Sequence, residues 1–270
     1  MSADQHQAPT SFFRRHSTGL LVPEPLAIGP WSANQIGGYA VCGVLARAIE
    51  GLADLAAFLP VRLTVDLCAP VAADIVQTQA HELLRSPRLQ LIDATVGRDE
   101  AVTARARAVF AKPTQEPPGQ MWRRTDDLPP DPPDCSDAPG PPLFTSGTGT
   151  WTDNFAQHQN ASRKTVWQRF PPLVDGEEMS PFVRAAVMAE TTSLVCHWGS
   201  AGAGFINIDT TLALTRLPDG VGLGLRADDQ RSQNGISIGT ATMFDRHGHL
   251  GTCTVTAIAN ARRQVDFTHR

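Results

Sequence analysis

Apolar and polar positions along the chain form two similar blocks. The first block begins with a helical pattern over 40–50, after Gly37-Gly38. Strand-like stretches rich in β-branched and apolar residues follow it at 61–67, 74–84, 89–96 and 101–110. Gly97-Arg98-Asp99-Glu100 separates the last two stretches, and such a sequence is typical of a hairpin turn. The first block therefore predicts one main helix followed by four strands.

The second block repeats this order. Ser180-Pro181 predicts a helix start, because serine is favoured at the N-cap and proline at the first helical position. Further strand-like stretches follow at 206–214, 221–227, 235–244 and 250–259. The residues Asp245-Arg246-His247-Gly248 indicate the last turn. A helix and an antiparallel sheet in each block predict an α+β fold with two related units.

A proline-rich segment over 113–142 separates the two blocks. Proline sustains neither a helix nor a central strand, so this segment is predicted to be a linker or an extended crossover. The sequence thus predicts an N-terminal unit over 1–112, a linker over 113–165 and a C-terminal unit over 166–270.

Composition and charge exclude several classes of protein. The net charge of -4 and the pI of about 6.0 show no basic footprint for nucleic acid. No apolar run approaches the roughly 20 residues that span a bilayer, and the N-terminus lacks the apolar stretch of a secretory signal. The five scattered cysteines form no CxxC pair, which favours a reducing compartment over a disulfide framework. We expect a cytoplasmic protein with no metal and no cofactor.

The second helix carries an unusual carboxylate. Glu190 falls on the same helical face as Val183, Ala186, Val187 and Leu194, with no basic residue one turn away. Burial among apolar neighbours raises the pKa of a carboxylate, which would suit Glu190 as a general base. Two other interpretations remain open. The carboxylate reaches solvent near the helix end, or it forms a structural ion pair with Arg184, Arg216 or Arg231.

Several short motifs, taken in order, resemble those of one family. They are Gly29-Pro30-Trp31 before Gly37-Gly38, Arg85-Ser86-Pro87-Arg88, Asp209-Thr210-Thr211 ending at Arg216-Leu217-Pro218-Asp219-Gly220, Asn234-Gly235, and Phe244-Asp245-Arg246-His247-Gly248. Their order and spacing resemble the double-hotdog acyl-CoA thioesterases and their thioesterase-like relatives. The resemblance implies two tandem hotdog units, each with a long antiparallel sheet wrapped around a central helix.

The resemblance also implies catalytic positions. The family's catalytic carboxylate, usually an aspartate, falls on Glu190, and the hydroxyl residue of the Asp-x-Thr strand falls on Thr211. The glutamine of the last strand falls on Thr256, counted from Gly248. One catalytic residue is therefore kept, one is longer by a methylene and one is replaced.

Three further residues are candidates for substrate binding. Gly37 and Gly38 open the first helix, where backbone N–H groups can meet a thioester carbonyl or an acyl chain can approach closely. A tight turn alone would explain the two glycines equally well. Asp209 is expected to orient or cap. On strict strand alternation Asp209 and Thr211 share a face opposite the apolar side chains of the 206–214 strand, and only a bulge would change this.

We therefore expect a thioester hydrolase in lipid metabolism that acts on acyl-CoA through a carboxylate-activated water. Two alternatives remain open. One is a hotdog enzyme that hydrates, dehydrates or rearranges an acyl intermediate, and the other is an inactive acyl-binding protein. The resemblance also implies a homo-oligomer.

Overall fold

The computed structural model describes residues 10–16, 20–98, 101–123, 128–130, 132, 138–147 and 149–268. The elements of the first unit are α1 (Gly38–Glu50), β3 (Leu59–Leu67), β4 (Thr78–Arg85), β5 (Leu89–Arg98) and β6 (Ala101–Ala111). A short hairpin of β1 (Phe13–Arg15) and β2 (Leu21–Pro23), followed by the 3-10 helix η1 (Pro25–Ala27), precedes them. None of the helices in these ranges has the length and hydropathy needed to cross a bilayer.

The second unit has more elements than the sequence predicted. Before its main helix it contains β7 (Leu143–Ser146), α2 (Phe155–His158) and β8 (Lys164–Arg169). The helices are α3 (Pro181–Glu190) and α4 (Thr192–His197). The strands after them are β9 (Trp198–Gly199), β10 (Gly202–Ala203), β11 (Phe205–Asn207), β12 (Asp209–Leu214), β13 (Gly222–Gln233), β14 (Ile236–Asp245) and β15 (Gly248–Ala259), and the 3-10 helix η2 (Ala261–Arg263) ends the series.

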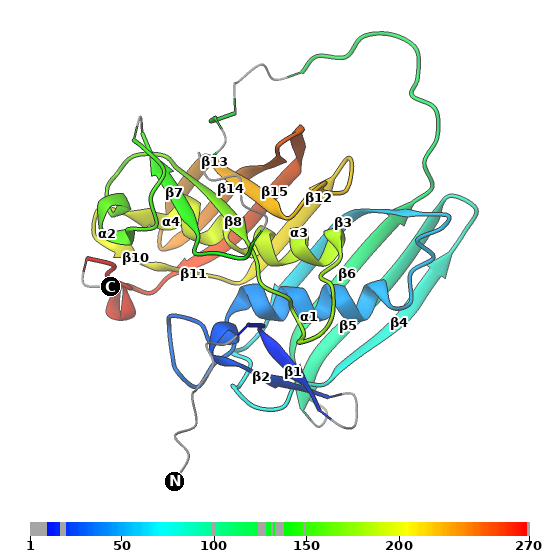
Figure 1. Cartoon of the computed structure of the whole chain (residues 1–270), viewed down its shortest axis with the longest axis horizontal. Helices are drawn as coiled ribbons and strands as arrows, with labels where there is room; N and C mark the ends of the chain where they lie inside the picture. Colours follow the sequence, from blue (N-terminus) through cyan, green and yellow to red (C-terminus); the bar gives the residue numbers. More distant parts are fainter. Residues whose placement is uncertain are drawn as a thin grey trace.

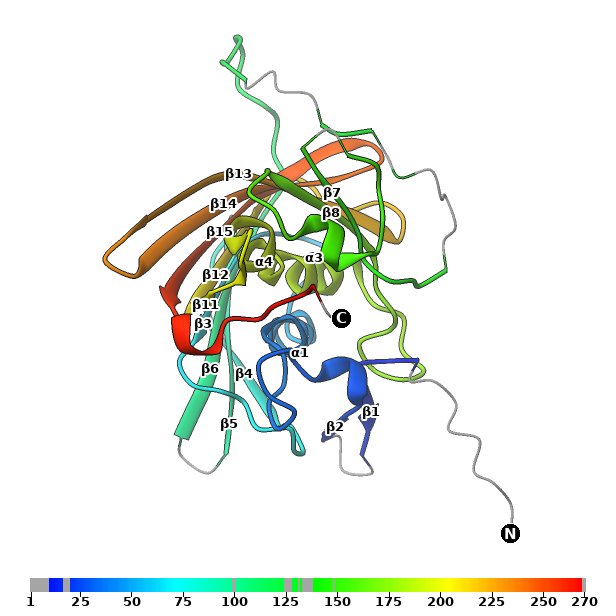
Figure 2. The ribbon, with the colours of Figure 1, turned by 90° about the vertical axis from the view of Figure 1, so that its left-hand side faces the viewer.

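One antiparallel sheet runs through both units. Its strand order in the described ranges is β4-β5-β6-β3-β12-β15-β14-β13-β8-β7, with β11 also paired to β15. The two units join where β3 pairs with β12, so that Leu63 lies opposite Leu212. The helices α1, α3 and α4 lie on one face of the sheet, which curves around them (Figures 1 and 2). The predicted α+β double-hotdog fold is confirmed.

Three predicted segments need correction. The strand predicted over 221–227 continues to Gln233 as β13. The strand predicted over 74–84 begins at Thr78, because Val76 exchanges two backbone hydrogen bonds with Leu21 of the N-terminal hairpin instead of pairing with β5. The predicted linker over 113–165 contains β7, α2 and the first residues of β8, whose strand pattern is hidden beside the prolines. The unit boundaries at 112 and 166 stay predictions.

The predicted start of the second helix is confirmed in detail. Ser180 Oγ accepts from Val183 N at 3.1 Å and Pro181 is the first helical residue. The helix ends at Glu190, because Thr191 N donates to Met188 O at 3.0 Å in a tightened last turn. A short helix, α4, then continues in a new direction. Glu190 is thereby placed at a helix end that faces the first unit.

A bulge separates β11 from β12. Asn207 lies opposite Ala257 of β15, whereas Thr211 lies opposite Thr254. Three residues on one strand therefore face two on the other, and one extra residue shifts the alternation of side chains. Asn207 and Thr210 point toward the helices and are buried, while Ile208 is 40% exposed. Over 209–214 the predicted alternation holds, with Asp209 and Thr211 on the face opposite Leu212 and Leu214, whereas at 206–208 it is wrong because of the bulge.

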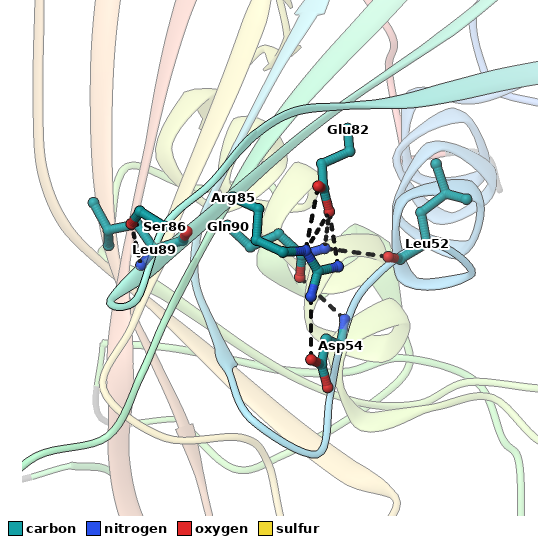
Figure 3. A network of polar contacts seen from close by, with 7 residues as sticks. All are labelled: Leu52, Asp54, Glu82, Arg85, Ser86, Leu89 and Gln90. Carbon is teal, nitrogen blue, oxygen red and sulfur yellow. Dashed lines mark hydrogen bonds and ion pairs between the residues drawn. The ribbon is translucent and has the colours of Figure 1, made fainter.

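The Arg85 corner fixes the far end of α1 (Figure 3). Arg85 pairs with Glu82 at 2.8 Å and with Asp54 at 3.2 Å. The fully buried Gln90 accepts from Asp54 N at 3.0 Å and donates to Leu52 O at 3.3 Å. Exposed ion pairs add little stability, but the buried amide ties the loop after α1 to β4 and β5. This corner therefore orients α1 and lies far along the helix from Gly37 and Gly38.

Candidate active site

A cavity of about 640 Å³ lies between the two units, beside the start of α1 and the end of α3. Its walls come from the loop before α1, from α3, α4 and β11, and from the C-terminal segment. That segment crosses in front of the helices (Figure 2) and is held by two hydrogen bonds of 2.9 Å between Ala203 and Val265. Among the described residues that line the cavity, Glu190 is the only one with an acidic or basic side chain.

The Glu190 carboxylate lies directly against the start of α1. A Cβ atom added at Gly38 would lie only 2.5 Å from Glu190 Oε1. Only a glycine at position 38 therefore leaves room for the carboxylate in this arrangement. The N-terminus of a helix favours a negative charge, so the contact brings a carboxylate of the second unit to the positive end of α1 in the first.

No basic side chain neutralises Glu190 within the described part of the chain. Arg184 donates to the carbonyl oxygens of Met179 and Gly220, and Arg216 forms a two-point ion pair with Asp245 at 2.6 and 2.7 Å. Arg231 lies 3.4 Å from Asp229. The ion-pair interpretation of Glu190 is therefore wrong for all three arginines.

Burial controls the proton affinity of Glu190. Removal from water raises the pKa of this carboxyl from its ordinary 4.5 to about 7, and the nearby amide of Asn207 opposes part of that rise. The charge of Glu190 in turn adds to burial in raising the pKa of Tyr39 and of Cys42. A carboxyl group with a pKa near neutrality can both accept and return a proton.

Asn207 is the site residue that the sequence prediction missed. It lines the same cavity as Glu190 and is 9% exposed. Its Nδ2 makes no hydrogen bond of good geometry with any described residue, so a buried donor remains available beside the carboxylate. The signal was present in the sequence. Asparagine is disfavoured within strands, and here it stands between Ile206 and Ile208.

Backbone donors line the same cavity at Gly38 and Tyr39. Gly37 N donates to Ala27 O at 2.8 Å, and the N–H groups of Ala40 and Val41 both donate to Gly37 O. The N–H groups of Gly38 and Tyr39 have no acceptor among the described residues. They belong to the first turn of a helix, where such groups attract a partial negative charge.

The other predicted residues lie outside the cavity. Thr211 Oγ1 bonds to Thr64 Oγ1 at 3.2 Å on the sheet face away from the helices. Asp209 Oδ1 accepts from Thr256 N at 2.7 Å and so closes the bulge. Thr256 lies on the same outer face between buried Val255 and Ala257, and Ala257 is the residue opposite Asn207. The structure therefore groups Glu190, Gly37 and Gly38 with Asn207, without Thr211, Thr256 or Asp209.

The fold and the cavity between its halves define a double-hotdog protein of the thioesterase type. The model of the family described as "Acyl-CoA thioesterase C-terminal domain" matches residues 102–259, and the chain belongs to this family. No curated protein matches the sequence.

Solved structures agree with this fold. A tesB protein of Mycobacterium avium subs paratuberculosis matches with a TM-score of 0.66 and 17% identity, over 93% of this chain and 96% of that one. A putative thioesterase II of Thermobifida fusca matches with a TM-score of 0.67 and 12% identity, over 93% and 97%. The acyl-CoA thioesterase II TesB2 of Mycobacterium marinum gives 0.60 and 12%, over 92% and 94%. At these identities the likeness establishes the fold.

The raised pKa of Glu190 predicts a stability change in Glu190→Gln. As the pH rises from about 4.5 through 7, the unfolded carboxyl loses its proton before the folded one, so the free energy of unfolding falls. Glutamine removes this penalty. The variant should be more stable than the wild type by about 2–3 kcal/mol at pH 8 and equal to it at pH 4. Urea unfolding at both pH values measures the difference, and a difference that does not change with pH would contradict the assignment.

Proposed function

We propose that the protein hydrolyses the thioester of an acyl-CoA, with Glu190 as the general base. The observation that carries the proposal is a partly buried carboxylate against the N-terminus of α1, with a pKa near 7 and no ion-pair partner among the described residues. Membership of an acyl-CoA thioesterase family supports acyl-CoA as the substrate. A cytoplasmic location, a homo-oligomer and a role in lipid metabolism stay predictions.

The reaction begins with a water molecule held by the Glu190 carboxylate and the Asn207 amide. Glu190 takes one proton from this water while the water oxygen forms a bond to the thioester carbonyl carbon. The carbon–sulfur bond then breaks with its electron pair on sulfur. Glu190 returns the proton to the sulfur, so the products are a carboxylic acid and free CoA. A carboxyl pKa near the working pH suits both transfers.

The N-terminus of α1 supplies the second part of the chemistry. Attack on the carbonyl carbon places negative charge on the carbonyl oxygen. Gly38 and Tyr39 line the cavity, and their N–H groups, which have no acceptor in the described part of the chain, suit that charge. One such donor is worth about 3 kcal/mol in a transition state. The base and the oxyanion donors therefore come from different units.

Asn207 replaces the amide that the resemblance places on the last strand. The position opposite it on β15 is Ala257, which has no polar group. An amide on β11 reaches the same cavity as Glu190 because the bulge turns position 207 toward the helices. Asn207 thus orients the water without taking its proton.

Replacement of the base is the first test. Glu190→Gln should lower kcat at least about 10³-fold, because glutamine cannot accept the proton. In the wild type, kcat should rise with pH through about 7 as Glu190 loses its proton. Release of free thiol from acyl-CoAs of several chain lengths measures both. An active Glu190→Gln variant would remove Glu190 from the mechanism, and a wild type that binds acyl-CoA without thiol release would refute hydrolysis.

A pair of polar variants separates the structural assignment from the sequence one. Asn207→Ala should lower kcat by about 10–100-fold, because the water loses an orienting donor. Thr211→Val should leave kcat within about twofold, because its hydroxyl contacts Thr64 on the other face of the sheet. The same thiol assay decides. The reverse order of effects would restore Thr211 to the site.

Two glycines of α1 provide a matched pair. Gly38→Ala should lower kcat/KM more than about tenfold, because the new methyl displaces the Glu190 carboxylate. Gly51→Ala at the other end of α1 should retain activity, since its methyl would meet its nearest atom at 3.5 Å and φ is -62°. Both substitutions are judged by thiol release, with circular dichroism to confirm folding. Equal activity of the two variants would contradict the close contact at Gly38.

A further inference from the structure

A second cavity of about 650 Å³ lies next to the first. Four residues line both cavities, namely Tyr39, Phe155, Thr191 and Leu194. Thr191 follows Glu190 directly in the chain, so the shared wall begins beside the carboxylate. The two cavities are therefore separated by only a few side chains.

The wall of the second cavity is apolar and aromatic. Among its described lining residues there is no Asp, Glu, Lys, Arg or His. Phe12 lies 5.8 Å from Tyr39 and 6.3 Å from Phe170 between ring centroids, and Phe144 lies 5.0 Å from Phe155. Such a surface suits an aliphatic chain and offers nothing to a phosphate.

The proline-rich crossover forms one side of this cavity through Pro139, Pro141 and Pro142. Gly140 anchors this stretch to β8, because its N–H donates to Arg169 O at 3.2 Å and its carbonyl accepts from Gln168 Nε2 at 2.9 Å. Opposite it, Phe12 N donates to Pro172 O at 3.1 Å. Hydrogen bonds therefore hold both the stretch at Gly140 and the N-terminal segment at Phe12 in place at the cavity wall.

Two arginines lie close in sequence to the segment that lines the first cavity. The exposed side chains of Arg262 and Arg263 come directly before the C-terminal segment that lines the first cavity through Val265 and Phe267. A CoA nucleotide carries phosphates and favours such a place. In the orientation that we infer, the CoA nucleotide lies toward Arg262 and Arg263, and the apolar end of the acyl chain is free to enter the second cavity.

We propose that the second cavity binds the distal part of the aliphatic acyl chain, so that the proline-rich crossover and the N-terminal segment set the chain-length preference. Tyr39 and Leu194 form the partition that the chain must pass. The Tyr39 hydroxyl lies 2.9 Å from Leu26 O and 3.0 Å from Ile28 O, which holds the ring in place. This inference rests on the proposed hydrolysis of acyl-CoA and adds the part of the substrate that is selected.

Filling the second cavity is the kinetic test. Leu26 lines the second cavity and not the first, and its side chain is 36% exposed, so Leu26→Trp adds bulk there without a cost in the core. The variant should lower kcat/KM at least about tenfold for palmitoyl-CoA and leave butyryl-CoA within about twofold, because each buried methylene contributes about fourfold. Leu84→Trp, at an exposed leucine that lines neither cavity, is the control. An equal effect on both substrates, or no effect on either, overturns the inference.

Photolabelling tests the same site without turnover. The probe is a CoA thioether, which cannot be hydrolysed, whose long alkyl chain ends in a diazirine. Its label should fall in peptides that contain 139–144 or 168–171, and Leu26→Trp should abolish that label. A label on Trp31 or Phe267 of the first cavity would place the chain elsewhere and overturn the proposal.

The two proposals fail in different ways. If Glu190→Gln abolishes hydrolysis and Leu26→Trp leaves the chain-length profile unchanged, the cavity assignment is wrong and the hydrolase assignment stands. If no acyl-CoA releases thiol, the hydrolase assignment fails, and the thioether label still decides where an aliphatic chain binds.

Discussion

Contact between Glu190 and the first turn of α1 is the constraint on which the site depends. The carboxylate belongs to the second unit and the helix to the first, so neither unit holds the site alone. Position 38 must be glycine for the helix and the carboxylate to touch, because a Cβ atom there would lie 2.5 Å from Glu190 Oε1. The pairing of β3 with β12 sets the relative position of the two units and therefore the distance between base and helix.

Desolvation then gives this contact its chemical character. Glu190 has no cationic partner in the part of the chain that the structure describes, so in this mostly apolar cavity it holds its proton more tightly than in water, and its pKa rises to about 7. The Asn207 amide limits the rise. The arginines that the sequence offered as partners of Glu190, namely Arg184, Arg216 and Arg231, bind carbonyl oxygens or other carboxylates instead. The same environment that makes Glu190 reactive also costs stability at neutral pH.

Local sequence signals predicted the helix starts, most strands and an α+β fold of two related units, because caps, turns and periodicity act over a few residues. The double-hotdog assignment came from the resemblance carried by the order of several motifs. Local signals also placed Glu190 on an apolar helical face and Gly37-Gly38 at the opening of a helix, and both assignments to these positions are consistent with the cavity. Thr211 and Thr256, which the resemblance placed in the site, lie on the outer face of the sheet, and for Thr211 strand alternation alone predicts that face. The bulge of one residue between β11 and β12 instead turns Asn207 inward, and nothing in the alternation of 206–214 marks it.

The sequence by itself determined the fold class, the two-unit organisation and the anomalous carboxylate. Tertiary structure decided which polar groups accompany it. Asn207 lies beside Glu190 because β11 shifts register against β15. Gly38 lies beside Glu190 because α1 and α3 belong to two units that are joined through one sheet. Both depend on contacts between residues far apart in the chain, whose register is set by packing rather than by the propensity of any short segment.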